Sequence, residues 1–312
     1  MQLPLENRSL GRGGPTVSFL GLGALEIGRD WGLGNADDRR RCDEQTAIAV
    51  VDCALDAGIT IIDTARAYHL SEDRVGMALA SRGNQVLLAT KCGEHSADPD
   101  TYYDFTTDAI NASIEESLLR LRTNRLDLLQ VHWGPPQHED LIWSDTVPAI
   151  LAARDAGKTA LIGASCPTER IKVCIESGYF DVLQVSYSLL DRTAEPGIQA
   201  AAEAGIGILV RDGLGGGRLT PRVLGAIGSE PSLAQQVVPL LDLLDADAIG
   251  VEAAAARLPE LALSFLSRNP AISSVLVGTK SPAHLLDSIR AVAASPDSSL
   301  VDDAVRIVNR HH

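Results

Sequence analysis

Eight short apolar segments recur along the 312-residue chain, and stretches with the apolar spacing of helices separate them. The segments are VSFLGL (17–22), ITIID (59–63), VLLAT (86–90), LDLLQV (126–131), TALIG (159–163), DVLQV (181–185), IGILV (206–210) and ISSVLV (272–277). Eight successive strand–helix units in a chain of this length predict an α/β fold, a closed (β/α)8 TIM barrel with right-handed crossovers. We therefore expect residues 1–312 to form a single barrel domain. The alternative is an open, doubly wound sheet.

The open sheet is less favoured because the chain lacks its nucleotide-binding sequence. GLGALE (21–26) ends the first strand but has no third glycine, and the following WGLGNADD cannot begin the helix that receives a pyrophosphate. This stretch is more typical of a strand followed by a rim loop.

Helix boundary signals agree with the barrel, and two stretches depart from its rhythm. Asp43 is placed as the N-cap of a helix that Gly58 stops. Residues 2–16 predict turns or a small hairpin at one end of the core. Residues 213–258 predict an insertion after strand seven, on the catalytic rim and with a glycine hinge. Residues 300–309 predict an extra C-terminal helix.

The charge of the chain excludes several classes of partner. Its net charge is -14, so its surface repels nucleic acids and anionic lipid headgroups. No apolar run of about 18 residues is present, and we expect a cytoplasmic protein with no membrane partner. Five cysteines without CxxC spacing indicate reduced thiols and no metal site.

Three neighbouring strands each end in an ionisable residue. The second strand ends in Asp63, the third in Lys91 and the fourth in His132, and Tyr68 follows Asp63 in the next loop. Consecutive barrel strands lie side by side, so these four side chains should meet on one rim, where barrel enzymes place their active sites. This convergence is the sequence signal that most directly indicates catalysis.

The four residue types suit proton transfer to a carbonyl oxygen. A free Tyr has a pKa of about 10, and a neighbouring Lys91 stabilises the phenolate and pulls that pKa down by about one to three units. Asp63 would keep Lys91 charged and oriented, and His132 can donate to a carbonyl or relay a proton. Singly, each residue also has a structural explanation as a cap, a surface charge, a core histidine or a wall residue.

Several segments together resemble the aldo-keto reductase family. They are DTARAYHLSEDRVGMAL, ATKCG, LDLLQVHW, LIGAS, DVLQVSYS and ISSVLVGTKSPAHLLDSI, in the family's order from about residue 17 to 294. The resemblance implies an NAD(P)-dependent reductase with a tetrad of Asp63, Tyr68, Lys91 and His132. It also implies that Tyr68 is the general acid for carbonyl reduction and the base for alcohol oxidation.

The same resemblance implies the cofactor contacts. Ser165 and Gln184 would hold the nicotinamide carboxamide, and the planar guanidinium of Arg211 stands where many members stack an aromatic ring. A glycine-rich loop would cover the pyrophosphate, because it lets backbone N–H groups approach phosphate oxygens. The loop residues are Gly213, Leu214, Gly216 and Gly217, and the segment expected to reach the adenosine phosphate contains Gly278, Thr279 and Lys280.

Some positions depart from the family pattern. Cys166 replaces the usual Asn after Ser165. At the adenosine end, three residues replace the Arg, Glu and Asn of NADP-preferring relatives, which removes a bidentate partner worth about 1.5 to 3 kcal/mol; they are His284, Asp287 and Ser288. The cofactor is therefore NAD or NADP, with Lys280 available for the latter. His69-Leu70 replaces a common Gly and is expected to reshape the pocket wall.

The branch and the substrate class follow from the resemblance alone. TKCG and SSVLVG look closest to the sugar-oxidising branch, such as L-galactose and aldose 1-dehydrogenases. We expect a small carbonyl, alcohol or sugar substrate, with Trp31, Trp133 and Trp143 as candidate pocket residues. Two alternatives from other classes are a non-catalytic, cofactor-sensing regulatory subunit and a Schiff-base aldolase built on Lys91.

Overall fold

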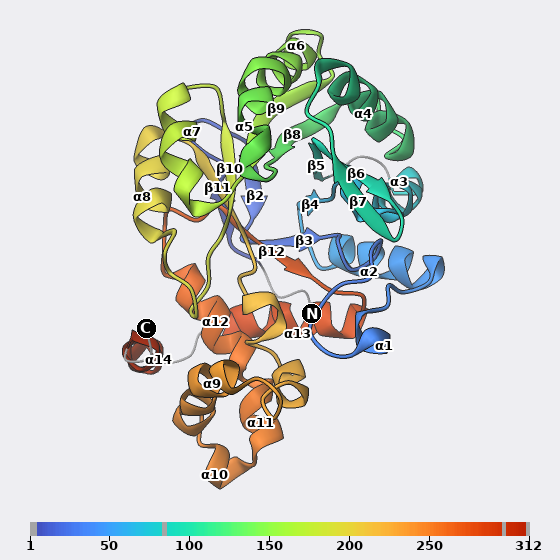
Figure 1. Cartoon of the computed structure of the whole chain (residues 1–312). Coiled ribbons are helices and arrows are strands. Elements are labelled where there is room, and N and C mark those ends of the chain that lie inside the picture. Colours follow the sequence, from blue (N-terminus) through green and yellow to red (C-terminus); the bar gives the residue numbers. More distant parts are fainter. Residues whose placement is uncertain (1–4, 83–85, 295–297, 310–312) are drawn as a thin grey trace.

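The structure, a computed structural model, describes residues 5–82, 86–294 and 298–309. Eight parallel strands close into a barrel in the order β10-β11-β12-β3-β4-β5-β8-β9 (Figure 1). The predicted TIM barrel is confirmed. The strands are β3 (Leu20–Gly23), β4 (Ile61–Asp63), β5 (Leu87–Cys92), β8 (Leu126–His132), β9 (Thr159–Ser165), β10 (Val182–Ser186), β11 (Gly207–Arg211) and β12 (Ser274–Gly278).

Helices surround the barrel, and all but the one at Leu258–Ser267 lie where the apolar spacing predicted helices. The first, α2 (Glu44–Asp56), begins where the Asp43 side chain accepts from the Thr46 N–H at 2.7 Å, and Gly58 follows its end with a φ of 86°. A left-handed φ is easiest for glycine, so the helix stops there. The other helices of the outer layer are α3 (Ser71–Ala80), α4 (Thr107–Arg120), α6 (Val147–Asp155), α7 (Ile171–Ser177), α8 (Glu195–Ala204), α12 (Leu258–Ser267) and α13 (Pro282–Ala294).

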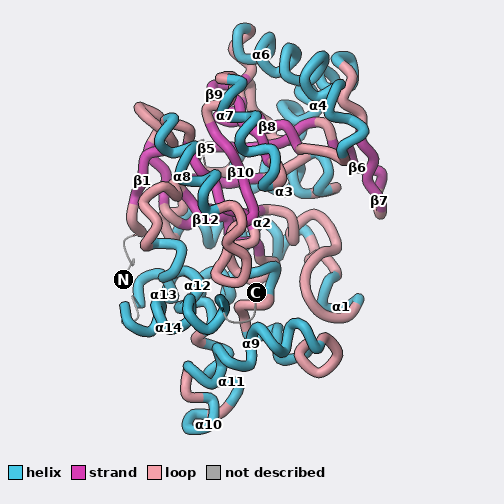
Figure 2. Tube along the Cα trace, turned by 60° about the vertical axis from the view of Figure 1, so that its left-hand side comes forward, coloured by secondary structure: helices cyan, strands magenta, loops and turns pink. Residues whose placement is uncertain are grey.

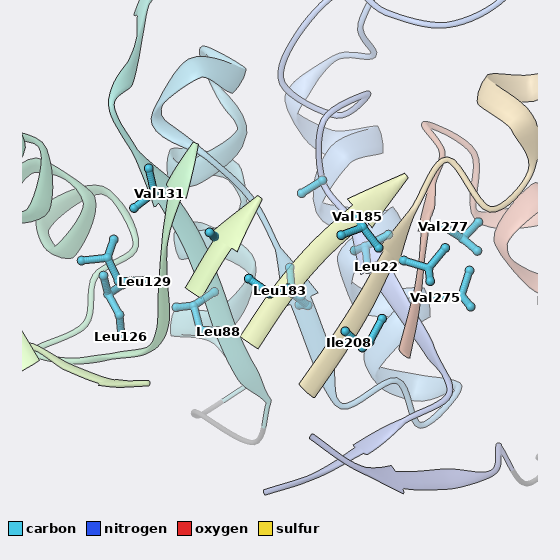
Figure 3. Packing of buried hydrophobic residues seen from close by; sticks show 14 of the residues in the cluster. Leu22, Leu88, Leu126, Leu129, Val131, Leu183, Val185, Ile208, Val275 and Val277 are labelled. Atoms are coloured by element: carbon cyan, nitrogen blue, oxygen red, sulfur yellow. The ribbon is translucent and has the colours of Figure 1, made fainter. Parts of the chain in front are cut away.

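The core has two layers, because a strand places alternate side chains on opposite faces. The larger cluster fills the space between strands and helices, and Figure 3 shows part of it, including Leu22, Val131 and Val277. A smaller cluster fills the barrel interior and includes Leu10 and Val17 from the N-terminal hairpin. The strands are thereby buried on both sides.

The N-terminal hairpin corrects the expected first strand. Residues 16–18 form β2 (Thr16–Ser18), which pairs antiparallel with β1 (Asn7–Ser9) instead of extending the barrel strand. Barrel pairing with β12 begins only at Leu20. The chain changes partner between these residues because the hairpin closes the barrel end with Leu10 and Val17.

The insertion after β11 is largely helical and has a hydrophobic cluster of its own. It contains η5 (Gly215–Gly217), η6 (Pro221–Gly225), α9 (Pro231–Leu243), α10 (Ala246–Ile249) and α11 (Val251–Ala256). Side chains of α9, α11 and α12 pack together with Val301, Ala304 and Val308 of the C-terminal helix α14 (Ser298–Asn309). In Figures 1 and 2, α9 to α11 project away from the barrel. Only the start of the insertion therefore lies on the rim.

Several short elements were not predicted from the sequence. These are η1 (Arg66–Tyr68), the hairpin of β6 (Glu94–Ala97) and β7 (Asp100–Tyr103), α1 (Ala36–Arg39), η2 (Pro136–His138), α5 (Glu139–Leu141), a π turn (Ile142–Thr146) and η4 (Thr168–Arg170). In the described ranges, none of the helices has the length and apolar character needed to span a membrane.

Candidate active site

The carboxyl ends of five adjacent strands place polar side chains on one rim. Asp63 ends β4, Lys91 is the next-to-last residue of β5, and His132 ends β8. The register then pairs His132 with Ser165 of β9, and Ser165 with Gln184 of β10. The side chains predicted to converge do share one rim.

Lys91 is the centre of the network. Its Nζ donates to Asp63 Oδ2 at 2.5 Å, to the backbone oxygen of Thr64 at 2.9 Å and to the Tyr68 hydroxyl at 3.1 Å. An ammonium group has three protons to donate, so all of them are used. Lys91 is 1% exposed, and the Asp63–Lys91 pair is a buried ion pair whose remaining donors are satisfied.

The second carboxylate oxygen of Asp63 accepts from two amides. Gln130 Nε2 donates to Oδ1 at 2.8 Å and Gln184 Nε2 donates to it at 2.9 Å. Ser165 Oγ in turn donates to Gln184 Oε1 at 3.0 Å. Gln130 was not among the predicted site residues, although the tripeptide Leu-Gln-Val occurs in both β8 and β10 and would have indicated two inward amides.

A buried ion pair holds the turn that presents Tyr68. The turn is η1, and its Arg66 lies 3.3 Å from Glu72 Oε2 and 2.5 Å from Glu116 Oε2. Thr90 Oγ1 donates to Glu72 Oε1 at 2.7 Å, which connects the turn to β5. Glu72 was expected only as an acidic residue in the first turn of a helix, but it is buried and fastens the Tyr68 turn to the barrel.

Burial and neighbouring charges act against each other on the pKa values of Lys91 and Tyr68. Burial lowers the pKa of Lys91, but Asp63 and Tyr68 outweigh it and the pKa stands above its usual value. Burial raises the pKa of Tyr68 above 10, although Lys91 pulls it down. The expected net decrease for Tyr68 was wrong, because removal of the phenolate from water costs more than one cation returns. At neutral pH, Lys91 is therefore charged and Tyr68 is protonated.

His132 lies beside Tyr68 and contacts a carboxylate that the sequence analysis did not single out. The two rings meet edge to face, with their centroids 6.0 Å apart. Nδ1 of His132 lies 3.0 Å from Glu94 Oε2, at the start of β6. Burial lowers the pKa of His132 and Glu94 opposes this, so the imidazole is neutral at pH 7. The network thus contains a neutral tyrosine, Tyr68, with a charged lysine and a neutral histidine beside it.

Comparison with known proteins gives this arrangement a family. The sequence model of the Aldo/keto reductase family matches residues 20–308. This chain belongs to that family. It is accordingly an enzyme, an NAD(P)-dependent oxidoreductase.

Several relatives match nearly their full length. L-galactose dehydrogenase of Arabidopsis thaliana is 29% identical over 299 residues, which cover 92% of this chain and 88% of that protein. D-threo-aldose 1-dehydrogenase of a Pseudomonas species is 29% identical, with 87% and 88% covered. NADH-specific methylglyoxal reductase of Escherichia coli is 26% identical, with 95% and 97% covered. The holo form of a Bacillus halodurans aldo-keto reductase superposes with a TM-score of 0.79 at 25% identity, covering 98% and 96%.

The glycine-rich loop of this aldo-keto reductase has the geometry of an open backbone surface. Gly215, Gly216 and Gly217 all have positive φ, and a Cβ on Gly216 would meet nothing within 4 Å. A Cβ on Gly213 would come within 2.7 Å of the Val275 side chain, so the loop starts tightly packed against β12. The loop leaves the barrel at one fixed point. Its backbone is partly closed on itself, because the N–H groups of Gly215 and Gly217 donate to the backbone oxygens of Asp212 and Leu214.

The segment after β12 is only partly arranged as expected. Lys280 follows β12 just before α13, and its Nζ donates to the backbone oxygens of Asp38 in α1 and of Arg40 directly after that helix. His284 is exposed on the first turn of α13. Ser288 is buried and donates to the His284 backbone oxygen at 3.1 Å, and its predicted contact with a cofactor stays a prediction.

Other candidate side chains have partners within the chain. Arg211 Nη1 donates to Asp212 Oδ2 at 2.8 Å, and Asp287 pairs with Arg290 at 2.6 Å. Trp133 and Trp143 pack edge to face, 5.5 Å apart, within the larger hydrophobic cluster, while Trp31 is exposed. Two of the three candidate tryptophans are thus packing residues.

The residues flanking Tyr68 join the hairpin. His69 has a φ of 51°, is buried, and contacts Ser96 Oγ through Nδ1 at 2.7 Å. Leu70 is 39% exposed. His69 therefore fixes the β6–β7 hairpin over the site, and Leu70 is the member of the pair with a free surface. Across the described ranges, His, Cys, Asp and Glu side chains form no cluster of three or more suited to a metal.

Proposed function

We propose that the chain transfers hydride between NAD(P) and a small carbonyl–alcohol or sugar hemiacetal pair, with Tyr68 as the proton donor and acceptor. The observation that carries this is the position of Lys91 Nζ, 2.5 Å from Asp63 and 3.1 Å from the Tyr68 hydroxyl. The ammonium stabilises negative charge on the phenol oxygen once a proton has left it.

The bound cofactor would supply or accept the hydride, and the chain's residues would place the reactants. Ser165 and Gln184 lie at adjacent strand ends and are already bonded at 3.0 Å, which supports them as partners of the nicotinamide carboxamide. Loop residues 213–217 would cover the pyrophosphate. Residues 278–280, with the N-terminus of α13, would face the adenosine phosphate, because helix N-termini favour anions.

In carbonyl reduction Tyr68 donates its proton to the oxygen that becomes the alcohol, while Lys91 stabilises the phenolate left behind. In alcohol oxidation the proton moves in the opposite direction, from the alcohol to the Tyr68 oxygen. The Lys91 ammonium is used up in three hydrogen bonds and is held charged by Asp63, so it is a poor nucleophile. This argues against the Schiff-base aldolase.

The test combines cofactor binding with turnover. We would titrate NADH and NADPH by fluorescence, then assay reduction of an aldehyde panel and oxidation of an aldose panel. Tyr68→Phe should bind cofactor normally and lose about 10²–10⁴-fold in kcat. Tyr179→Phe, which removes an exposed hydroxyl away from the rim, is the matched control. Full turnover by Tyr68→Phe would refute the assignment, and cofactor binding without any turnover would favour the sensing subunit.

A further inference from the structure

The helical insertion after β11 carries a groove on the part that projects from the barrel. The groove has a volume of about 480 Å³ and is lined by residues of η6, α9, α10 and α11, which stand clear of the barrel strands in Figure 2. Val238 and Val251 are 39% and 42% exposed, so its walls present apolar surface to solvent. The apolar lining consists of Leu224, Ile227, Val238, Leu241, Ala246 and Val251.

The charged groups around this groove are all carboxylates. Asp242, Asp247 and Glu252 line it together with the apolar side chains. Residues 223–256, which contain the whole lining, include five carboxylates and no lysine, arginine or histidine. The groove therefore combines apolar walls with a rim of one sign of charge.

The arginines that flank this segment in the sequence are engaged with other carboxylates. Arg222 lies 3.2 Å from Glu26 in the loop after β3, and Arg257 lies 3.8 Å from Glu260 on α12. Within residues 5–82, 86–294 and 298–309, no ion pair neutralises the groove carboxylates. Their charge is available to a partner.

This charge decides between the candidate occupants of the groove. Nucleic acids and anionic lipid headgroups would be repelled. A second copy of the chain in a two-fold dimer would bring the same acidic patch onto itself and place like charges face to face. A polypeptide that carries lysines or arginines beside apolar side chains matches both the walls and the rim.

The elements that form the groove favour a helix as its occupant. Backbone N–H and C=O groups within helices are bonded inside the helix, so the groove offers no strand edge for pairing. An amphipathic helix can place its apolar face in such a groove, while the stems of its lysines and arginines lie along the walls and their charged ends reach the carboxylates.

We propose that this groove is a docking site for a basic amphipathic helix of a partner protein. The groove shares no residue with the tetrad or the glycine-rich loop, so docking there is a role beyond the proposed hydride transfer and does not depend on it.

A peptide of defined composition tests the groove without any turnover. The probe is a fluorescein-labelled amphipathic helix of about 15 leucines and lysines. Its anisotropy is measured against the full chain at about 150 mM salt, which screens long-range attraction. Binding should be visible below about 100 µM protein, and a peptide with glutamates in place of the lysines should not bind.

Two sets of variants locate the bound peptide. The first removes the three groove charges, and the second makes the exposed apolar walls polar; each should weaken binding about tenfold. All the substituted side chains are exposed, so both variants should fold as the wild type does. The first is Asp242→Asn/Asp247→Asn/Glu252→Gln, and the second is Val238→Ser/Val251→Ser.

The matched control removes three exposed carboxylates elsewhere, in Glu44→Gln/Asp108→Asn/Glu169→Gln, and should change the affinity less than about twofold. An equal loss in the control would mean general attraction to an acidic protein and would overturn the inference, as would a wild type that does not bind the leucine–lysine peptide. Sedimentation of the free chain tests the second copy as occupant. A dimer that dissociates in Val238→Ser/Val251→Ser would assign the groove to self-association and also overturn the inference, whereas a monomer supports it.

Discussion

The strand-end network and the outer loops differ in how completely hydrogen bonds among their own residues hold them in place. The strand-end network, formed by Asp63, Tyr68, Lys91, Gln130 and Gln184, is buried or nearly so and bonded to itself at 2.5 to 3.1 Å. The outer loops, residues 213–226 and 278–288 with the first turns of α13, are partly exposed and bonded to other segments. The network is fixed by barrel register, whereas the loops depend on contacts that a cofactor can rearrange.

The largest expected effect comes from removing the cation of the network. Lys91→Met leaves Asp63 buried without its ion-pair partner, so the free energy of unfolding should fall by about 3–5 kcal/mol. Turnover should fall about 10³-fold because the phenolate loses its stabilising charge. Chemical denaturation and steady-state assays measure the two effects.

A double variant separates stability from catalysis. Asp63→Asn combined with Lys91→Met removes both charges, so it should recover most of the lost stability but none of the activity. If the free energy of unfolding of the single variant Lys91→Met stays within 1 kcal/mol of wild type, the network is not a preassembled unit.

The sequence predicted the network better than the loops for a physical reason. Carboxyl ends of neighbouring parallel strands meet at one rim whatever the loops do, so Asp63, Lys91 and His132 could be placed together from the strands alone. Gln130 was missed because a single polar residue in an apolar strand does not show which face of the strand its side chain occupies. The predicted direction of the pKa shift of Tyr68 was wrong, because the burial that raises this pKa depends on the whole fold.

Other features of the site depend on tertiary packing, which decides orientation. Sequence spacing put His284 and Ser288 on one helix but not on a particular side, and packing buried Ser288 while leaving His284 exposed. Glu94 was missed because the hairpin that carries it has no counterpart in the strand–helix rhythm. Its contact with His132 is visible only in three dimensions.

The second prediction concerns acid stability on the network side. The folded pKa of Glu94, about 2, is below its usual 4.5, so its contribution to stability is present above pH 4.5 and is lost as the pH falls toward 2. The difference of about 2.5 units corresponds to about 3 kcal/mol. Glu94→Gln should flatten the stability profile in this window, measured by urea unfolding at several pH values. Glu252→Gln, an exposed carboxylate on α11, should leave the slope unchanged, and an equal slope in both variants would contradict the prediction.

The third prediction moves to the outer loops. His284 is exposed on the first turn of α13, and the only lysine in the segment 278–288 is Lys280, which is bonded to carbonyls near α1. His284→Arg should therefore tighten NADPH about tenfold, or about 1.4 kcal/mol, and leave NADH nearly unchanged, as measured by fluorescence titration. Ala283→Arg adds the same charge at the neighbouring exposed position, and its gain in affinity for NADPH should be much smaller. Equal gains for both cofactors would show that the adenosine phosphate lies elsewhere.

The smallest expected effect tests whether the outer loops are held by exposed charges. Arg222 of η6 lies 3.2 Å from Glu26 in the loop after β3, and both side chains are partly exposed. Such a pair contributes about 0.5 kcal/mol, so Glu26→Gln should speed cofactor release only about twofold in stopped-flow measurements. Salt screens exposed pairs, and wild type at high ionic strength should therefore release cofactor as fast as the variant does. A double-mutant cycle of Glu26→Gln and Arg222→Met measures the coupling energy between the two side chains. A coupling energy above 1.5 kcal/mol that does not change with salt would mean that the outer loops are preassembled like the strand-end network.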